Sequence, residues 1–352
     1  MSLLAALQAR IALWPLRELG PGARVQGQIW APFWRGTIRA GRNLHIAASE
    51  EPVELHALWG GEICMGDDVT IEGGTSIEAQ ARVSIGNGVH IGPLCKIMDN
   101  HFHFNARDPW RRPDSQPVVI EDGANIGAGA IILPGAHVPR GASVPAGAVF
   151  WTSRNQAKVC PIPVPPPPAG LRGALYRTEE RALDLLGVAR ALLALRGSDS
   201  EPRIRVGNLA VEGRERVRVG HHTKFQPGMT PTRLIAHEGG RIAMGCRNLI
   251  NYGNRIEAWR SITIGDRCLM GSRISICDRG PNGDAPIVIG DEVWIAHGAS
   301  IDPGVRIESG SVIAAGAVVR GNVPADSVAI GNPARCMSLR MLRSPRTVSA
   351  GH

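Results

Sequence analysis

A six-residue repeat is the feature that most constrains how this chain can fold. An aliphatic residue opens each hexad, a glycine often follows it, and a small or apolar residue stands four places after the first. A period of six matches neither the alternation of a strand nor the turn of a helix. It predicts an all-β solenoid in which each hexad is one short strand plus a turn and three hexads close a triangular coil. In the first half the hexads open at Ile85, Ile91, Ile97, Ile120, Ile126, Ile132, Val138 and Val144. In the second half they open at Ile264, Met270, Ile276, Ile289, Ile295, Ile301, Ile307 and Ile313.

The composition agrees with a β fold that contains many tight turns. The chain has 43 glycines among 352 residues and only 4% aromatic residues. Glycine accepts the positive φ angles that tight corners need, and small or β-branched residues fill the interior of a narrow coil. The hexad-opening aliphatic residues are therefore predicted to stack in the interior.

The segments outside the hexads divide the chain. The spacing of the apolar residues in 2–14 predicts an amphipathic helix. We expect this helix to pack against the end of its domain or against a neighbouring subunit, with contact to a membrane surface as the alternative. The sequence CPIPVPPPPA at 160–169 predicts a stiff linker, followed by a helix whose apolar face consists of Leu175, Leu183, Leu186, Ala189 and Leu193. The predicted domains are an N-terminal helix (1–19), a first β-helix (20–159), a Pro-rich linker with a connector helix (160–202), a second β-helix (203–340) and a flexible tail (341–352).

Charge and cysteine content narrow the range of partners. The formal charge of +8 fits solubility or an anionic partner, such as a phosphate-bearing cofactor or a lipid surface. No Lys/Arg run with interleaved aromatic residues is present, so we expect no nucleic-acid partner. The seven cysteines form no CxxC pair, which predicts a reducing compartment and no metal site. There is no apolar stretch long enough for a transmembrane helix, and the N-terminus is a poor signal peptide, so we expect a cytoplasmic protein, with peripheral membrane contact as an alternative.

The two halves of the chain are copies of one another. Gly66 and Gly245 lie 179 residues apart, as do Asp99 and Asp278, whereas Pro117 and Pro286 lie 169 apart. The first copy therefore carries 179 − 169 = 10 extra residues between Asp99 and Pro117. This loop contains two histidines, His101 and His103, and the corresponding segment of the second copy, RGPNGDA, contains none. A long loop that interrupts a regular repeat at one place is where function usually lies.

Both halves resemble the hexapeptide-repeat, left-handed parallel β-helix acyltransferases, the group that contains the maltose, galactoside, xenobiotic and polysaccharide O-acetyltransferases. The resemblance covers about 40–158 and 204–340. The motifs that carry it are the hexads, IMDNHFH with the following PVVIEDGANIGAGAIILPG, IVIGDEVWIAHGASIDPG, and VAIGNPAR. It implies two tandem left-handed β-helices, acetyl-CoA as acyl donor, a sugar, polysaccharide or glycolipid precursor as acceptor, and a homotrimer with CoA in the groove between neighbouring subunits.

The resemblance also implies a catalytic base. In the family a loop histidine deprotonates the acceptor, and an imidazole with a pKa near 6.5 can do so at neutral pH. The pattern I-x-D-x-x-F-H places the base at His103, with Asp99 as its supporting carboxylate. Another branch of the family favours His101. Two alternatives stay open: both histidines are ordinary surface residues, or Asp99 starts the loop as an Asx-type turn.

Further site residues follow by position. Trp110 and Arg111 could cover a sugar ring or meet CoA phosphates. Many family members carry an active-site Asn, which aligns with Asn251 of the second copy, whereas the first copy has Glu72 there. His297 could substitute for the missing base in the second copy, which we interpret as a degenerate copy with a structural or acceptor-binding role. The residues assigned to CoA are Ala128, Arg154, Lys158, Arg320 and Arg335.

Three function classes remain from the sequence. The leading hypothesis is a CoA-dependent O-acyltransferase. The alternatives are a non-catalytic or decayed β-helix that serves as a scaffold or binds carbohydrate, and an N-acyltransferase acting on an amino sugar. A zinc hydratase of the γ-type carbonic anhydrase class would need an H-x4-H pair, and the sequence has none.

Overall fold

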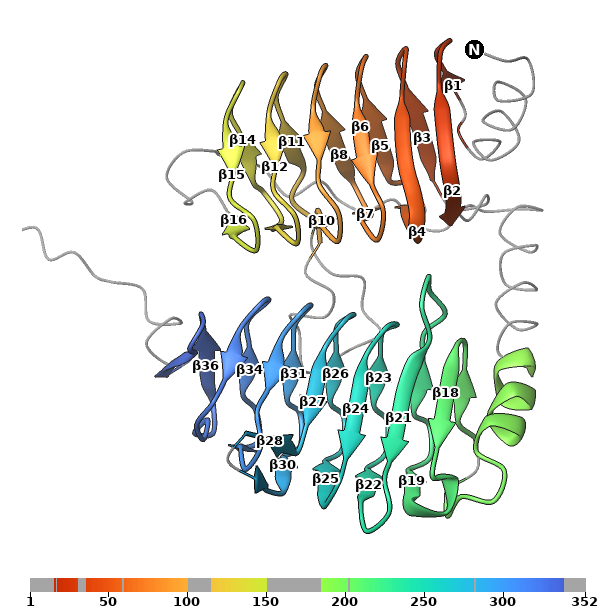
Figure 1. Ribbon diagram of the computed structural model, residues 1–352, viewed down its shortest axis with the longest axis vertical. Helices are drawn as coiled ribbons and strands as arrows, with labels where there is room; N and C mark the ends of the chain where they lie inside the picture. The colour runs from red at the N-terminus through yellow and green to blue at the C-terminus, as the bar shows by residue number, and fades with distance from the viewer. Residues whose placement is uncertain are drawn as a thin grey trace, which may run out of the picture. The chain divides into compact units, whose positions relative to one another are not determined.

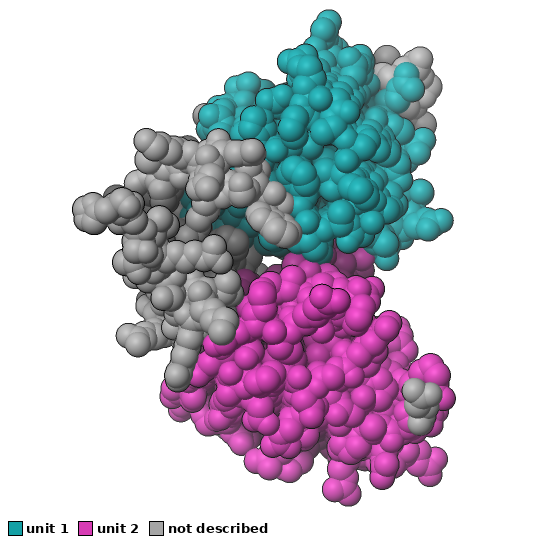
Figure 2. Space-filling view, turned by 90° about the vertical axis from the view of Figure 1, so that its left-hand side faces the viewer, with its two compact units in different colours: residues 1–178 teal, residues 179–352 magenta. Residues whose placement is uncertain are grey.

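The computed structural model describes residues 16, 18–30, 36–58, 60–100, 115–150, 185–201, 203–281 and 283–338. Short, mostly parallel strands are the main regular elements of these residues, in two compact units, 1–178 and 179–352 (Figures 1 and 2). The prediction of an all-β solenoid with two tandem left-handed β-helices is confirmed. The predicted N-terminal helix, the Pro-rich linker and the C-terminal tail lie outside the described residues. No described helix is long and apolar enough to cross a membrane.

The first unit stacks its strands in three columns, one for each side of a triangular coil. Strand β4 (His45–Ala57) runs through a corner and belongs to two columns, so two sides form one ten-stranded sheet. The six-stranded side contains β1 (Glu18–Leu19), β3 (Thr37–Ala40), β5 (Glu62–Met65), β8 (Arg82–Ile85), β11 (Val118–Ile120) and β14 (His137–Val138). The second side contains β2 (Arg24–Trp30), β4, β6 (Thr70–Glu72), β9 (His90–Ile91), β12 (Asn125–Ile126) and β15 (Ser143–Val144). The third side contains β4, β7 (Ser76–Ala79), β10 (Lys96–Met98), β13 (Ile131–Ile132) and β16 (Val149–Phe150).

The second unit repeats the three-sided arrangement. Its longest sheet contains β17 (Arg205–Val206), β20 (Lys224–Phe225), β23 (Leu249–Ile250), β26 (Leu269–Met270), β31 (Trp294–Ile295), β34 (Val312–Ile313), β36 (Ser327–Ile330) and β37 (Arg335–Ser338). The next side contains β18 (Leu209–Glu212), β21 (Thr232–Ala236), β24 (Arg255–Ala258), β27 (Ser275–Cys277), β32 (Ser300–Ile301) and β35 (Val318–Val319). The third contains β19 (Val217–Val219), β22 (Arg241–Met244), β25 (Ser261–Ile264), β30 (Ile287–Ile289) and β33 (Arg306–Ile307), with the 3₁₀ turn η1 (Arg214–Arg216) before β19. A small hairpin, β28 (Arg279–Gly280) with β29 (Gly283–Asp284), leaves the coil.

The hexad-opening residues form the core, as predicted. Ile85 of β8 pairs with Ile120 of β11, which pairs with Val138 of β14, so residues three hexads apart in the repeat lie directly above one another. All three side chains are at most 4% exposed. Burying an aliphatic side chain of this size stabilises the fold by about 2 kcal/mol relative to leaving it exposed.

A ladder of side-chain acceptors runs along one corner of each unit. In the first unit the backbone N–H of Asp67 donates to Asn87 Oδ1, and the N–H of Asn87 donates to Asp122 Oδ1, both at 2.8 Å. Each coil thus satisfies a backbone donor of the coil before it. A glycine precedes Asp67 and Asn87, and the one at position 86 is required because a Cβ there would collide with the carboxylate of Asp122. The ladder therefore explains the glycine in the second place of those hexads that pass through this corner.

The helix at 185–194 packs on the second unit through a face that differs from the predicted one. Ala191 of this helix and Leu195, which follows the helix directly, are buried in the core of the second unit. Leu186, Ala189 and Leu193, which belong to the predicted apolar face, are exposed, with Leu193 at 71%. Leu175 and Leu183 of that face lie outside the described residues. The prediction was wrong because leucines follow both faces of this helix, and only contact with the first coil decides which face is covered.

Candidate functional site

The two ends of the histidine loop meet on the third side of the first unit. Asn100 and Ser115 form an isolated antiparallel bridge, and the backbone N–H of Gln116 donates to the carbonyl of Asp99 at 2.7 Å. Asp99, Asn100 and Ser115 are completely buried. The stem of the loop is thus anchored to the coil beside β7 and β10. Residues 101–114 lie outside the described residues, and with them His101, His103, Trp110 and Arg111, whose roles stay predictions.

The carboxylate of Asp99 is occupied by its own solenoid. It accepts hydrogen bonds from the backbone N–H groups of Gln80, Ala81 and Arg82 at 2.6–2.8 Å. Burial raises the pKa of Asp99, and these N–H groups oppose that rise because they stabilise the charged form. Asp278, its counterpart in the second copy, accepts from Trp259 and Arg260 in the same way at 2.6 and 2.8 Å. Since the second copy has no histidine loop, the shared role of this acid is to hold the preceding turn.

A buried polar cluster lies on the outer side of β4, β7 and β10, next to the loop stem. The ammonium of Lys96 donates to Ser76 Oγ at 2.8 Å and forms a close ion pair with Glu78. Ser76 Oγ in turn donates to Glu54 Oε2 at 2.6 Å. These four side chains are at most 3% exposed although their strands direct them away from the core. Among the described residues, Oε2 of Glu78 has no hydrogen-bond partner.

The hexad pattern alone does not reveal this cluster. The hexad register does identify Glu54, Ser76 and Lys96 as outward residues of neighbouring coils. An outward position is usually solvated, so the pattern carries no sign that the cluster is buried. Charged groups buried together must be paired, because an unpaired buried charge costs several kcal/mol.

Glu72 takes part in a chain of polar contacts on the second side of the first unit. Its Oε1 lies 2.8 Å from Nε2 of His90, and Nδ1 of the same ring lies 2.9 Å from Asn125 Oδ1. The three residues come from successive coils, β6, β9 and β12. His90 and Glu72 are each more than a third exposed, so the pair is accessible to a ligand. The predicted substrate contact of Glu72 stays a prediction.

The predicted residues of the second copy lie at one corner of its coil. Asn251 Oδ1 accepts the backbone N–H of Tyr252 at 2.9 Å, which closes the turn after β23. His297 is 8% exposed, and its Nδ1 lies 2.8 Å from the buried Ser272 Oγ. Both side chains thus contribute to the local turns, and their roles toward an acceptor stay predictions.

Three of the residues assigned to CoA are described, and they lie at separate exposed positions. Ala128 is exposed in the turn after β12, Arg320 lies 3.4 Å from Asp302, and Arg335 begins β37. Arg154 and Lys158 lie outside the described residues. No cofactor geometry follows from these positions, and the assignments stay predictions.

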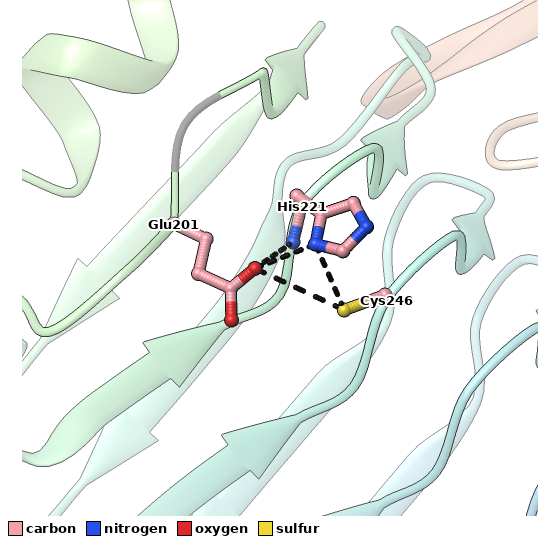
Figure 3. Close-up of side chains that lie close together, drawn as sticks. All are labelled: Glu201, His221 and Cys246. Atoms are coloured by element: carbon pink, nitrogen blue, oxygen red, sulfur yellow. Dashed lines mark hydrogen bonds and ion pairs between the residues drawn. The ribbon is translucent and has the colours of Figure 1, made fainter.

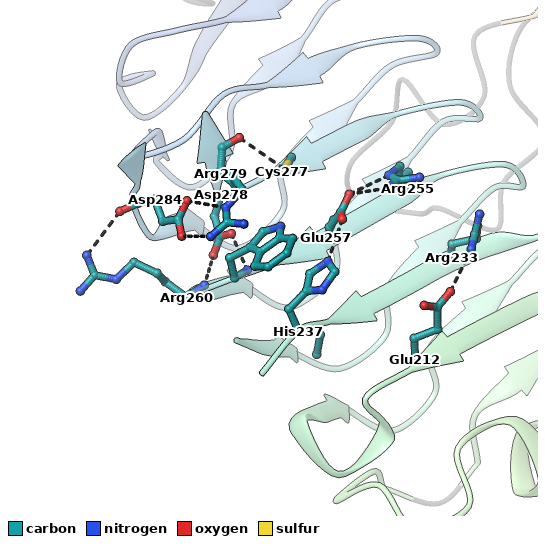
Figure 4. Close-up of polar contacts among 12 residues, drawn as sticks. Glu212, Arg233, His237, Arg255, Glu257, Arg260, Cys277, Asp278, Arg279 and Asp284 are labelled. Carbon is teal, nitrogen blue, oxygen red and sulfur yellow. Dashed lines mark hydrogen bonds and ion pairs between the residues drawn. The ribbon is translucent and has the colours of Figure 1, made fainter. Parts of the chain in front are cut away.

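The corresponding side of the second unit carries exposed charges and an aromatic stack (Figure 4). Arg233 pairs with Glu212 at 2.8 Å, and Arg255 pairs with Glu257. Near the hairpin, the ring of His237 stacks on Trp259 with centroids 3.5 Å apart, and the guanidinium of Arg279 lies 3.4 Å above the same indole. Arg279 is held by a bidentate pair with Asp284. Both faces of the indole are therefore covered, and no open aromatic platform remains there.

Comparisons with known proteins agree with this fold. The family model of bacterial transferase hexapeptides (six repeats) matches residues 286–321, and that of the hexapeptide repeat of succinyl-transferase matches 117–149 and 261–303. The matches fall in both units. Each of the two copies therefore contains repeats that are similar to those of the hexapeptide-repeat transferases.

Three individual relatives each match less than half of the chain. The galactoside O-acetyltransferase of Escherichia coli is 34% identical over 108 residues, which are 28% of this chain and 53% of that enzyme. The 2,3,4,5-tetrahydropyridine-2,6-dicarboxylate N-acetyltransferase of Staphylococcus aureus is 44% identical over 55 residues, 16% of this chain and 23% of that enzyme. A solved hexapeptide-repeat acetyltransferase of Vibrio cholerae, complexed with acetyl coenzyme A, is 24% identical, with coverages of 48% and 89% and a TM-score of 0.32. The chain spans about half the length, or less, of most curated relatives it matches.

Proposed function

We propose that this protein is a CoA-dependent acyltransferase that moves an acetyl group from acetyl-CoA to a hydroxyl of a sugar, polysaccharide or glycolipid precursor. The observation that carries the proposal is the anchored loop of the first copy, in a chain whose repeats are similar to those of the transferase family. The stem at Asn100 and Ser115 holds the loop at one defined place on the coil. The second copy closes the same position with the short hairpin β28–β29.

The proposed chemistry needs one proton acceptor. Neutral His103, or His101 as the alternative, takes the proton from the acceptor hydroxyl, and the oxygen attacks the thioester carbonyl. The tetrahedral intermediate collapses, the carbon–sulfur bond breaks, and the imidazolium returns the proton to the departing CoA thiolate. Backbone N–H groups of a neighbouring coil are available donors for the oxyanion. As in the family, we propose a homotrimer with CoA bound between neighbouring subunits.

An amine acceptor is the second candidate, because one relative is an N-acetyltransferase. The same base and donor would serve, and only the attacking atom would differ. The products separate the two: an oxygen ester is cleaved by alkaline hydroxylamine, whereas an amide is not.

The test is release of free CoA thiol from acetyl-CoA with a panel of sugar acceptors. We expect His103→Ala to reduce the rate by roughly 100-fold or more, the size of a general-base contribution. His101→Ala tests the alternative base. His137→Ala is the matched control, because His137 lies on β14, where its Nε2 pairs with Glu121. No thiol release and no CoA binding by the parent protein would favour the decayed, non-catalytic β-helix.

A further inference from the structure

In the first coils of the second unit, the corner ladder has different side chains from those in the later coils. From Cys246 onward it follows the pattern of the first unit: the N–H of Cys246 donates to Asp266 Oδ1 at 2.7 Å, and the N–H of Asp266 donates to Asp291 Oδ1 at 2.8 Å. One coil earlier the pattern stops, because a cysteine stands where the acceptor should be. The N–H of His221 donates instead to Glu201 Oε2 at 3.1 Å. The thiol is therefore not needed to satisfy the backbone.

Three different metal-binding side chains meet at this corner (Figure 3). His221 Nδ1 lies 2.6 Å from Glu201 Oε2 and 3.2 Å from Cys246 Sγ, and the sulfur lies 3.9 Å from the same carboxylate oxygen. The side chains of His221 and Glu201 are 41% and 34% exposed, so an ion can reach them from solvent. Arg218 contacts the other carboxylate oxygen at 3.4 Å and leaves Oε2 directed toward the histidine.

We propose that Glu201, His221 and Cys246 form a zinc-binding site. A thiolate, an imidazole and a carboxylate are the donors that Zn²⁺ selects, whereas Mg²⁺ and Ca²⁺ prefer oxygen ligands throughout. Tetrahedral bonds of about 2.0–2.3 Å separate donor atoms by roughly 3.3–3.8 Å. The two separations that involve the sulfur are close to that range. The shorter O···N contact is the hydrogen bond that binding would replace, and water would complete the coordination.

The protonation of the thiol gives the site a measurable signature. Zn²⁺ is bound by a thiolate, so a cysteine must lose its proton to become a zinc ligand. Zn²⁺ binding breaks the S–H bond, forms the S–Zn bond and releases that proton to the buffer.

The first copy shows that the fold itself does not require these donors. At the same offset of 179 residues it has Gly22, Arg42 and Asp67. Arg42 donates its backbone N–H to Asp67 Oδ1 at 2.7 Å and pairs with Oδ2 through its guanidinium. The corner is thus closed by an ion pair, with one carboxylate and no soft ligand.

A second group of possible ligands is less suited to an ion. Glu54, His56 and Glu78 also bring their ligand atoms within 4.8 Å of one another. The ammonium of Lys96 already pairs with Glu78 there, and its positive charge opposes a cation. The corner of the second unit is therefore the site we propose.

The experiment is a titration of the full-length protein with Co²⁺, which reports a thiolate ligand through a sulfur-to-cobalt charge-transfer band, followed by displacement with Zn²⁺. Calorimetry of Zn²⁺ binding in two buffers of different ionisation enthalpy counts the released protons. We expect one ion per chain and about one proton released.

The matched variants follow from the first copy. Cys246→Asp restores the ordinary ladder acceptor and should fold, lose the charge-transfer band and bind Zn²⁺ at least about 100-fold more weakly, since even outer-shell changes cost 10–100-fold. His221→Arg with Cys246→Asp recreates the Arg42–Asp67 pair and should bind no ion. Cys336→Ser is the control, because Cys336 is an exposed free cysteine elsewhere. A band that survives Cys246→Asp, or a parent protein without one-to-one Zn²⁺ binding, would overturn the proposal.

Discussion

The third side of the first unit and the corresponding side of the second unit have the same strand arrangement. Their outward side chains differ in solvent exposure. Glu54, Ser76 and Lys96 of the first copy are buried. The residues 179 positions later are Arg233, Arg255 and Ser275, all exposed, with the two arginines in surface ion pairs. The hexad register places both sets at outward positions. The comparison teaches that the repeat determines the direction of a side chain but not its solvation.

The two copies also differ at the same point of the coil, directly after Asp99 and Asp278. In the first copy the chain leaves the coil through the buried stem formed by Asn100 and Ser115. In the second copy it makes the short hairpin β28–β29. The acids that precede these two connections perform the same backbone task. The difference between the copies at this point thus lies in the connection that follows the acid.

Exchange of the loop should have the largest effect. We expect replacement of residues 100–116 by residues 279–285 of the second copy to leave the solenoid folded, because the second unit closes its coil with that segment. Thiol release from acetyl-CoA should fall by roughly 100-fold or more, as expected when a general base is lost. The reciprocal change in the second copy, with the first copy intact, is the control. Full activity of the exchanged protein would contradict the assignment of the chemistry to this loop.

Removal of one buried charge should cost more than removal of an exposed one. Lys96→Met should destabilise the first unit by about 3–5 kcal/mol, because Glu78 is left as an uncompensated buried charge. Arg233→Met should cost about 1 kcal/mol or less, since its pair with Glu212 is solvated. Denaturant unfolding followed separately for each unit measures both values. Equal effects would mean that the two sides have similar environments.

The two corner acids should respond to substitution almost alike. Asp99→Ala and Asp278→Ala should each destabilise by roughly 1.5–3 kcal/mol through lost charge-assisted hydrogen bonds. The effect of Asp99 should be the larger one, because three N–H groups lose their acceptor instead of two. Asp99→Asn tests the catalytic alternative: thiol release within about tenfold of the parent is expected from a structural acid. A greater loss with unchanged stability would show that Asp99 supports the base.

Acid should weaken the second unit slightly through Glu257. Burial acts to raise the pKa of Glu257, but hydrogen bonds from His237 and Arg255 outweigh it, and the pKa is lowered from 4.5. A depressed pKa in the folded state gives stability that is present above pH 4.5 and is lost as the pH falls below that value. Glu257→Gln should therefore reduce the slope of melting temperature against pH in this range. A variant with the parent slope would show that the pairs with His237 and Arg255 contribute no stability.

The sequence alone determined the repeat, the core, the duplication and the loop. Hexads with a buried aliphatic opening residue and a following glycine admit one architecture, since Ile85, Ile120 and Val138 must stack when three hexads close a coil. The offset between the copies located the inserted loop without any coordinates. These properties depend on residues that lie near one another in the chain or that repeat at a fixed interval.

Only the tertiary structure decided which outward residues are buried and which donors converge. Whether Lys96 is solvated depends on what covers the outer side of its strand, and the hexad pattern does not record that. Glu201, His221 and Cys246 are 20 and 25 residues apart, spacings that match no metal-binding motif. They meet because equivalent corner positions of successive coils lie above one another. Residues that are one coil apart in the sequence are therefore neighbours in space.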